Sequence, residues 1–217
     1  MRIWKGFRCA VLAAALAVSA YPAGAAESPQ ALLAGTREAL GKVTELRAHF
    51  EQTSLLVASG LDTRSGGTVE LARGGRMRWT YAGDDPQQIV SDGVTLWFYQ
   101  VRDRTVLRRD LAGLPPASRL ALDVLGGFAG IEEQFALGTC GERCLELTPR
   151  APQPDLARLR IELGGDGLVE SIATEDALGN HTRVAFSALE LQPGLEKERF
   201  QFSPPEGVEV LDMEAPR

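Results

Sequence analysis

Residues Gly66–Leu111 read GGTVELARGGRMRWTYAGDDPQQIVSDGVTLWFYQVRDRTVLRRDL, and they carry the clearest strand signals in the 217-residue chain. This stretch contains four short runs rich in β-branched and aromatic residues: Thr68–Ala72, Met77–Tyr81, Gln88–Ser91 and Thr95–Val101. Turn-forming residues separate these runs, at Gly74-Gly75, at Gly83-Asp84-Asp85-Pro86 and at Asp92-Gly93. Such runs between such turns are typical of an antiparallel β-meander.

The last of these runs carries large apolar side chains on both faces. Successive residues of a strand point to opposite sides, so Leu96 and Phe98 share one face while Trp97 and Tyr99 share the other. Each face must therefore be covered. A core on one side and a helix on the other would achieve this, and so would a face that lines a cavity. The sequence leaves both arrangements open.

About ten strands are expected over the whole chain. Outside the meander, strands are predicted at Arg47–Val57, Gln134–Leu137, Leu145–Thr148, Leu156–Leu163, Leu168–Glu175 and His181–Leu191, and Gly60–Gly67 is predicted to be a turn region. The length fits one domain, and 44% hydrophobic residues can supply a core. Short, evenly spaced strands favour a mainly β (α+β) fold with one curved antiparallel sheet or open barrel.

Two segments have helical character. Ser28 is a predicted N-cap with Pro29 at the first helical position, and an apolar stripe follows at three- and four-residue steps. The stripe consists of Leu33, Thr36, Leu40, Val43 and Leu46. A second apolar segment, residues 120–128, is bounded by glycines. It is either a lid or plug, or a short crossover helix packed in the core.

The N-terminus has the pattern of a secretory signal peptide. Basic residues open the chain, an apolar run of about twelve residues spans Cys9–Ala20, and small residues follow at Ala23–Ala26. We expect residues 1–26 to be removed and residues 27–217 to form a single domain. The run is too short to span a bilayer, although an uncleaved anchor is the alternative. In a Gram-negative bacterium, export would place the protein in the periplasm.

Two cysteines remain after this segment, Cys140 and Cys144. An oxidising compartment favours a disulfide between them, and the three intervening residues suit a tight hairpin turn. A metal site is disfavoured because no His or second Cys pair lies nearby, and a redox pair is more typically separated by two residues. We predict a local clip that contributes little stability.

The sequence offers few candidates for catalysis. His49 and His181 are the two histidines, and no Gly-x-Ser-x-Gly motif, phosphate-binding glycine loop or Cys/His metal cluster is present. We therefore predict no enzyme activity, no metal and no cofactor. The net charge of −6, with no basic stripe, disfavours nucleic acid as a partner. Surplus apolar strand surface favours the binding of a hydrophobic ligand.

The central strands also resemble a known family, the periplasmic outer-membrane lipoprotein carrier family LolA. The resemblance rests on Leu71-Ala72-Arg73, on Met77–Tyr81, on Gln88–Tyr99 and on the C-terminal Phe200–Val208. It implies an open, incomplete antiparallel β-barrel of about ten to eleven strands, with a helical lid over an apolar cavity. It also implies a carrier that takes acylated lipoproteins from an inner-membrane ABC-type complex to an outer-membrane receptor. The absence of a long charged tail favours a monomer.

The resemblance assigns roles to particular residues. Arg73 matches an arginine that holds the lid shut through backbone carbonyls, although Gly74 stands where the family usually has proline. Cavity or lid positions are expected at Trp79, Leu96, Phe98, Leu122 and Leu125. Two other functions stay open: a carrier of another lipid or glycolipid for a specialised exporter, and a sensor that binds lipoproteins without shuttling them.

Overall fold

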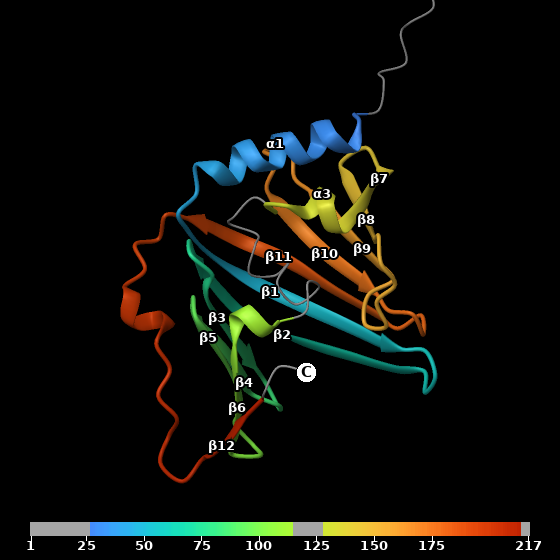
Figure 1. The fold of residues 1–217 in the computed structure, drawn as a ribbon. Coiled ribbons are helices and arrows are strands. Elements are labelled where there is room, and N and C mark those ends of the chain that lie inside the picture. The colour runs from blue at the N-terminus through green and yellow to red at the C-terminus, as the bar shows by residue number, and fades with distance from the viewer. Residues whose placement is uncertain (1–26, 115–127, 214–217) are drawn as a thin grey trace, which may run out of the picture.

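The computed structural model describes residues 27–114 and 128–213, which form one 12-stranded sheet and short helices (Figure 1). The strand order is β12-β6-β5-β4-β3-β2-β1-β11-β10-β9-β8-β7, so the sheet has two free edges and does not close into a barrel. Every neighbouring pair is antiparallel except β12 and β6, which are parallel. The predicted open, mainly β architecture is confirmed.

The elements have the following bounds. In the first half, the strands are β1 (Glu45–Leu56), β2 (Leu61–Ala72), β3 (Arg76–Ala82), β4 (Gln87–Asp92), β5 (Thr95–Gln100) and β6 (Thr105–Asp110). In the second half, they are β7 (Phe135–Gly141), β8 (Cys144–Pro149), β9 (Arg158–Leu163), β10 (Val169–Glu175), β11 (His181–Leu191) and β12 (Glu209–Asp212). The helices are α1 (Pro29–Gly41), η1 (Leu111–Gly113), α3 (Ile131–Gln134) and η3 (Lys197–Phe200).

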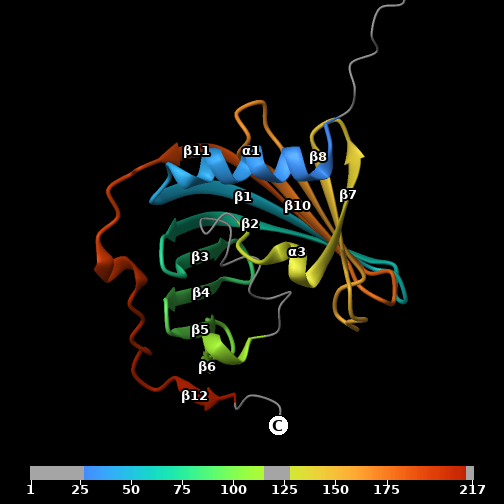
Figure 2. The ribbon, with the colours of Figure 1, turned by 45° about the horizontal axis from the view of Figure 1, so that its top comes forward.

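Helix α1 begins as the sequence predicts. The Ala31 backbone N–H donates to the Ser28 hydroxyl at 3.2 Å, and Pro29 occupies the first turn. The helix lies across the curved sheet and contacts β7 and β8 (Figure 2). It ends at Gly41, so the predicted stripe was too long: Val43 follows the helix and Leu46 belongs to β1. Both residues are buried, which is why they continued the apolar pattern.

The prediction of a turn at Gly60–Gly67 was wrong. Most of this segment is the first half of β2, which pairs with β1 over its whole length. Gly60 ends the turn at residues 57–60 with a φ of 64°, whereas Gly66 and Gly67 lie within β2 and reflect close backbone approach. A Cβ atom on Gly67 would lie 1.8 Å from the Thr80 carbonyl oxygen, and one on Gly66 would lie 2.8 Å from that of Phe50.

A C-terminal strap, residues 192–208, covers the outer face of the first half of the sheet (Figure 1). Arg78 donates to the backbone carbonyls of Arg199 at 2.6 Å and Gln201 at 3.0 Å. The Phe202 ring lies 6.2 Å from that of Trp97 and 5.8 Å from that of Tyr99, measured between centroids. The outer face of the two-sided strand β5 is therefore covered by the strap and not by a helix.

The strap is also fixed by a buried carboxylate on β2. Glu70 has an exposed fraction of 4%, and it accepts hydrogen bonds from Arg47 at 3.0 Å and from Arg199 at 2.8 Å. A buried carboxylate needs such compensation, because an unpaired charge away from water is costly. Arg199 therefore ties the strap to the centre of the sheet, while Arg47 on β1 helps to neutralise the buried charge.

A disulfide joins Cys140 and Cys144 at the hairpin between β7 and β8, with the two Cα atoms 5.0 Å apart. The bond closes a very short loop. We expect replacement of both cysteines by serine to lower the free energy of unfolding by no more than about 2 kcal/mol and to leave ligand binding unchanged. Urea unfolding of the two proteins measures this difference. A loss of about 4 kcal/mol or more would show that the clip supports the sheet beyond its own hairpin.

Candidate functional site

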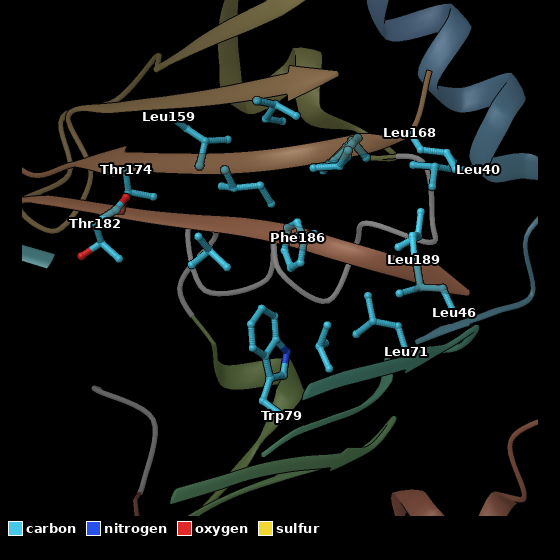
Figure 3. Close-up of a pocket in the computed structure, with 16 residues that line it drawn as sticks. Leu40, Leu46, Leu71, Trp79, Leu159, Leu168, Thr174, Thr182, Phe186 and Leu189 are labelled. Atoms are coloured by element: carbon cyan, nitrogen blue, oxygen red, sulfur yellow. The ribbon is translucent and has the colours of Figure 1, made fainter. Parts of the chain in front are cut away.

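An apolar cavity of about 200 Å³ lies on the inner face of the sheet, beneath the C-terminal end of α1 (Figure 3). Apart from two threonines, all of its described lining residues are apolar. They are Leu40, Leu46, Val69, Leu71, Trp79, Phe128, Leu159, Ile161, Leu168, Val169, Ile172, Thr174, Thr182, Val184, Phe186 and Leu189. Thr174 and Thr182 lie together at the end of the cavity remote from Leu40 (Figure 3). Such a lining suits a hydrocarbon ligand.

Strand register makes the cavity floor continuous. Residues directly opposite one another on neighbouring strands point to the same face, and Val69 lies opposite Trp79 on the first half of the sheet. On the second half, Ile172 lies opposite both Val184 and Ile161. Because side chains alternate along each strand, the inward-facing apolar residues of neighbouring strands lie side by side and form one continuous apolar surface.

Aromatic rings pack together beside the cavity, and two of them, Trp79 and Phe186, line it. The Phe50 ring packs edge-on against Trp79 at 4.7 Å and against Tyr81 at 4.9 Å, and Trp79 lies 6.0 Å from Phe186, all between centroids. The Tyr81 hydroxyl donates to the side-chain carbonyl of Gln52 at 3.0 Å. Burial raises the pKa of Tyr81, so its phenol stays neutral beside the apolar floor.

Arg73 binds the C-terminal end of α1. Its guanidinium donates to three backbone carbonyls: Val43 at 3.0 Å, Leu40 at 3.2 Å and Gly41 at 2.8 Å. The Arg73 backbone N–H adds a bond to the Thr44 carbonyl at 3.0 Å. The last carbonyls of a helix lack partners within it and carry partial negative charge, so a cation there is favourable. Arg73 thus joins the end of β2 to the helix above the cavity.

A second connection ties α1 to α3. Arg37 donates to both carboxylate oxygens of Glu132, at 2.6 and 2.7 Å, and to the Phe128 carbonyl at 3.0 Å. Phe128 lines the cavity. Hydrogen bonding from Arg37 lowers the pKa of Glu132 below its ordinary value of 4.5. The helix above the cavity is therefore anchored at two places.

Acid is expected to weaken the second anchor. A carboxyl whose pKa is depressed by folding stabilises the folded state above its ordinary pKa of 4.5, and this contribution disappears as the pH falls through the depressed value. The contribution is small, because the side chains of Arg37 and Glu132 are 36% and 44% exposed. We expect Glu132→Gln to lower the protection of the α1 amides against hydrogen exchange at pH 7, and to reduce the loss of protection that wild type shows in acid, where protection is measured relative to the intrinsic exchange rate at each pH.

The control for this prediction is Glu38→Gln. Glu38 lies on the same helix and pairs with Lys42, but both side chains are more than 70% exposed. It should leave exchange in α1 unchanged. Equal exchange in the Glu132 variant and wild type at pH 7 would show that the α1–α3 pair does not hold the helix.

The predicted cavity residues are only partly brought together. Trp79 lines the cavity. Leu96 packs against the core beside it, and Phe98 lies opposite Ile89 on the same inner face, but neither appears in the described lining. Leu122 and Leu125 lie outside the described residues, as does the predicted signal peptide, residues 1–26.

Most of the lining comes from strands outside the meander, which the sequence gives no reason to place at the site. β9, β10 and β11 supply Leu159, Ile161, Val169, Ile172, Thr174, Thr182, Val184, Phe186 and Leu189. Alternation in these strands was visible, with Val184 and Phe186 on one face. What it could not show was that β11 pairs with β1, which brings the second half of the chain beside the meander.

Over residues 27–114 and 128–213, no cluster of three or more His, Cys, Asp or Glu side chains is arranged to hold a metal ion. In the same ranges, no helix has the length and apolar character needed to cross a membrane.

Comparison with known proteins identifies the family. Residues 41–203 match the family model described as outer membrane lipoprotein carrier protein LolA. An outer-membrane lipoprotein carrier protein of Halorhodospira halophila is 35% identical over 175 residues, covering 78% of this chain and 80% of its relative. One of Chromobacterium violaceum is 32% identical over 206 residues, covering 93% and 94%.

A solved structure supports the fold alone. An uncharacterised conserved protein of Thermus thermophilus superposes with a TM-score of 0.52 at 11% identity, covering 85% of this chain and 98% of that one. The family match spans strands β1 to β11, Arg73 and most of the strap. By this match and by the identity to its relatives, the chain belongs to the LolA family of outer-membrane lipoprotein carrier proteins.

Proposed function

We propose that this protein binds the acyl chains of lipoproteins in the apolar cavity and carries them across the periplasm. It would receive them from an inner-membrane ABC-type complex and deliver them to an outer-membrane receptor. The observation that carries the proposal is the nearly unbroken apolar lining between the inner sheet face and α1. Residues 1–26 would act as the export signal and residues 27–217 as the carrier, which would work as a monomer without catalysis or cofactor.

Acyl burial supplies ample binding energy. Each buried methylene contributes about 0.8 kcal/mol, so about fifteen methylenes would give about 12 kcal/mol if fully buried. That corresponds to an affinity near nanomolar. A carrier with that affinity would hold its cargo too tightly unless binding also carried a cost.

The size of the cavity supplies such a cost. At about 200 Å³ it is smaller than the roughly 300–1,000 Å³ of typical ligand sites. A full acyl chain therefore enters only if the cavity widens. Widening separates α1 from the sheet and breaks the contacts of Arg73 with Leu40, Gly41 and Val43. The energy of these contacts subtracts from the gross affinity and favours release.

A release assay tests the proposal. Spheroplasts that bear a labelled lipoprotein are incubated with the mature protein, and the soluble fraction is examined for a one-to-one complex. A soluble complex with intact lipoprotein is the expected result. If lipoprotein stays in the membrane while a free lipid or glycolipid is solubilised, the cavity serves another lipid cargo. If nothing is solubilised and an acyl-chain dye does not bind either, the carrier proposal fails.

A further inference from the structure

One end of the sheet carries an exposed apolar patch that the cavity does not use. The turn between β1 and β2 lies beside the turn between β10 and β11 in both ribbon views (Figures 1 and 2). The Val57 N–H donates to the side-chain carbonyl of Asn180 at 2.9 Å, which joins the two turns. We call the patch the apolar tip, and its residues, with exposed fractions of 39% to 80%, are Leu55, Leu56, Val57, Leu61 and Leu178.

The apolar tip presents side chains on both faces of a hairpin. Leu55 and Leu56 are consecutive in β1 and so point to opposite sides, while Leu56 shares a face with Leu61 directly opposite on β2. A flat protein partner would cover one of these faces and leave the other in water. A medium that surrounds the hairpin end covers both at once. The geometry thus favours a lipid layer as the occupant.

Several backbone N–H groups of the apolar tip already donate hydrogen bonds within the protein, so they do not depend on water. Besides the Val57–Asn180 bond, Ser59 N–H donates to the Leu56 carbonyl and Gly60 N–H to the Val57 carbonyl, each at 3.3 Å. Backbone groups that lack such partners cost several kcal/mol each in a lipid environment. Turns that satisfy their own N–H groups avoid most of that cost.

Charged residues limit how deeply the apolar tip can insert into a lipid layer. Asp62 follows Leu61 directly, Arg64 is exposed two residues further along β2, and Asp176 forms the base of the second turn. Charged side chains are costly in hydrocarbon, so insertion must stop at the interfacial layer. Because the charges have mixed sign, attraction to anionic lipid should contribute little.

The tip adjoins one end of the cavity. Leu55 pairs with His181, and the next residue, Thr182, pairs with both Ser54 and Thr174. Thr174 and Thr182 line the cavity end remote from Leu40 (Figure 3). We infer that the apolar tip inserts shallowly into the interfacial layer of a lipid bilayer and holds this end of the cavity at the membrane surface. Only the purpose of this contact rests on the proposed function, since membrane binding by the tip stands without it.

Vesicle flotation tests the inference. The mature protein is mixed with phosphatidylethanolamine–phosphatidylglycerol vesicles that contain no lipoprotein. We compare wild type with the triple variant Leu55→Ser, Leu56→Ser and Leu178→Ser, and with the control Val94→Ser. Val94 is 69% exposed in another turn. We expect wild type and control to float alike, the triple variant to bind at least about tenfold more weakly, and high salt to change little. Absence of wild-type flotation, or equal flotation by the triple variant, overturns the inference.

A gain-of-signal variant removes any dependence on the folding of the triple variant. Val57→Trp should show a blue-shifted emission on vesicle addition and quenching by lipids brominated near the headgroup, whereas Val94→Trp should show neither. Unchanged emission of Val57→Trp contradicts insertion.

An acyl-chain dye separates membrane binding by the tip from the carrier function. Wild type that floats but binds no dye contradicts the carrier function alone. Loss of dye binding in the folded triple variant would assign these leucines to the cavity and overturn the inference.

Discussion

Arg73→Leu is expected to leave cargo loading intact and to impair cargo release. The guanidinium makes three hydrogen bonds to carbonyls at the end of α1, and leucine makes none. These bonds stabilise the state in which the helix lies on the sheet and the cavity is small. Because acyl binding requires that state to open, removing the bonds favours the loaded form.

The size of the effect follows from the strength of the bonds. Hydrogen bonds to charged groups contribute about 1.5–3 kcal/mol each when well buried, but Arg73 is exposed, so we expect about 2 kcal/mol for the set. Release should therefore slow by about thirtyfold. The rate is measured by transfer of labelled lipoprotein from the purified complex to receptor-bearing membrane vesicles.

Two variants serve as controls for Arg73. Arg73→Lys keeps the charge but lacks the planar set of donors, so it should fall between wild type and Arg73→Leu. Arg102→Leu removes an exposed arginine from the turn between β5 and β6, away from both α1 and the apolar tip, and should release cargo at the wild-type rate. Transfer by Arg73→Leu at the wild-type rate would remove the latch role from this residue.

The meander could be predicted because its signals are local. Turn residues such as Asp92-Gly93 and alternation in the runs fix strands β3, β4 and β5 without reference to the rest of the chain. Strand β12 could not be predicted in this way. Its four residues are all exposed, and its parallel pairing with β6 joins segments about a hundred residues apart.

The candidate site shows the same division between local and distant information. The family resemblance pointed to Arg73, and the structure gives it carbonyl partners on α1, whereas the sequence carries no sign of which carbonyls these are. The β1–β11 pairing is likewise invisible locally, and it decides that β11 lines the cavity. The outer face of β5 is covered by Phe202, which comes from the C-terminal part of the chain, so the local sequence of β5 could not predict its cover.

Filling the cavity is expected to abolish tight acyl binding without unfolding the protein. Val184 is partly buried on the inner face of β11, where it lines the cavity opposite Ile172. In Val184→Phe, a ring would occupy space that a ligand chain needs. Forcing a chain into an overpacked site costs about 1–3 kcal/mol, so we expect affinity for an acyl-chain dye to fall by as much as about a hundredfold.

The matched control for Val184→Phe is Ser187→Phe. Ser187 is exposed on the opposite face of the same strand, where it pairs with His49, so the same ring there points away from the cavity. Its dye affinity should equal that of wild type.

The melting temperature of Val184→Phe should stay close to that of wild type, because the new ring enters an existing space and displaces little packing. If Val184→Phe binds the dye as wild type does while remaining folded, acyl chains bind elsewhere on the protein. If both variants lose binding, the loss reflects damage to β11. Only loss in Val184→Phe alone, with melting preserved, locates the acyl chain on the inner face of the sheet.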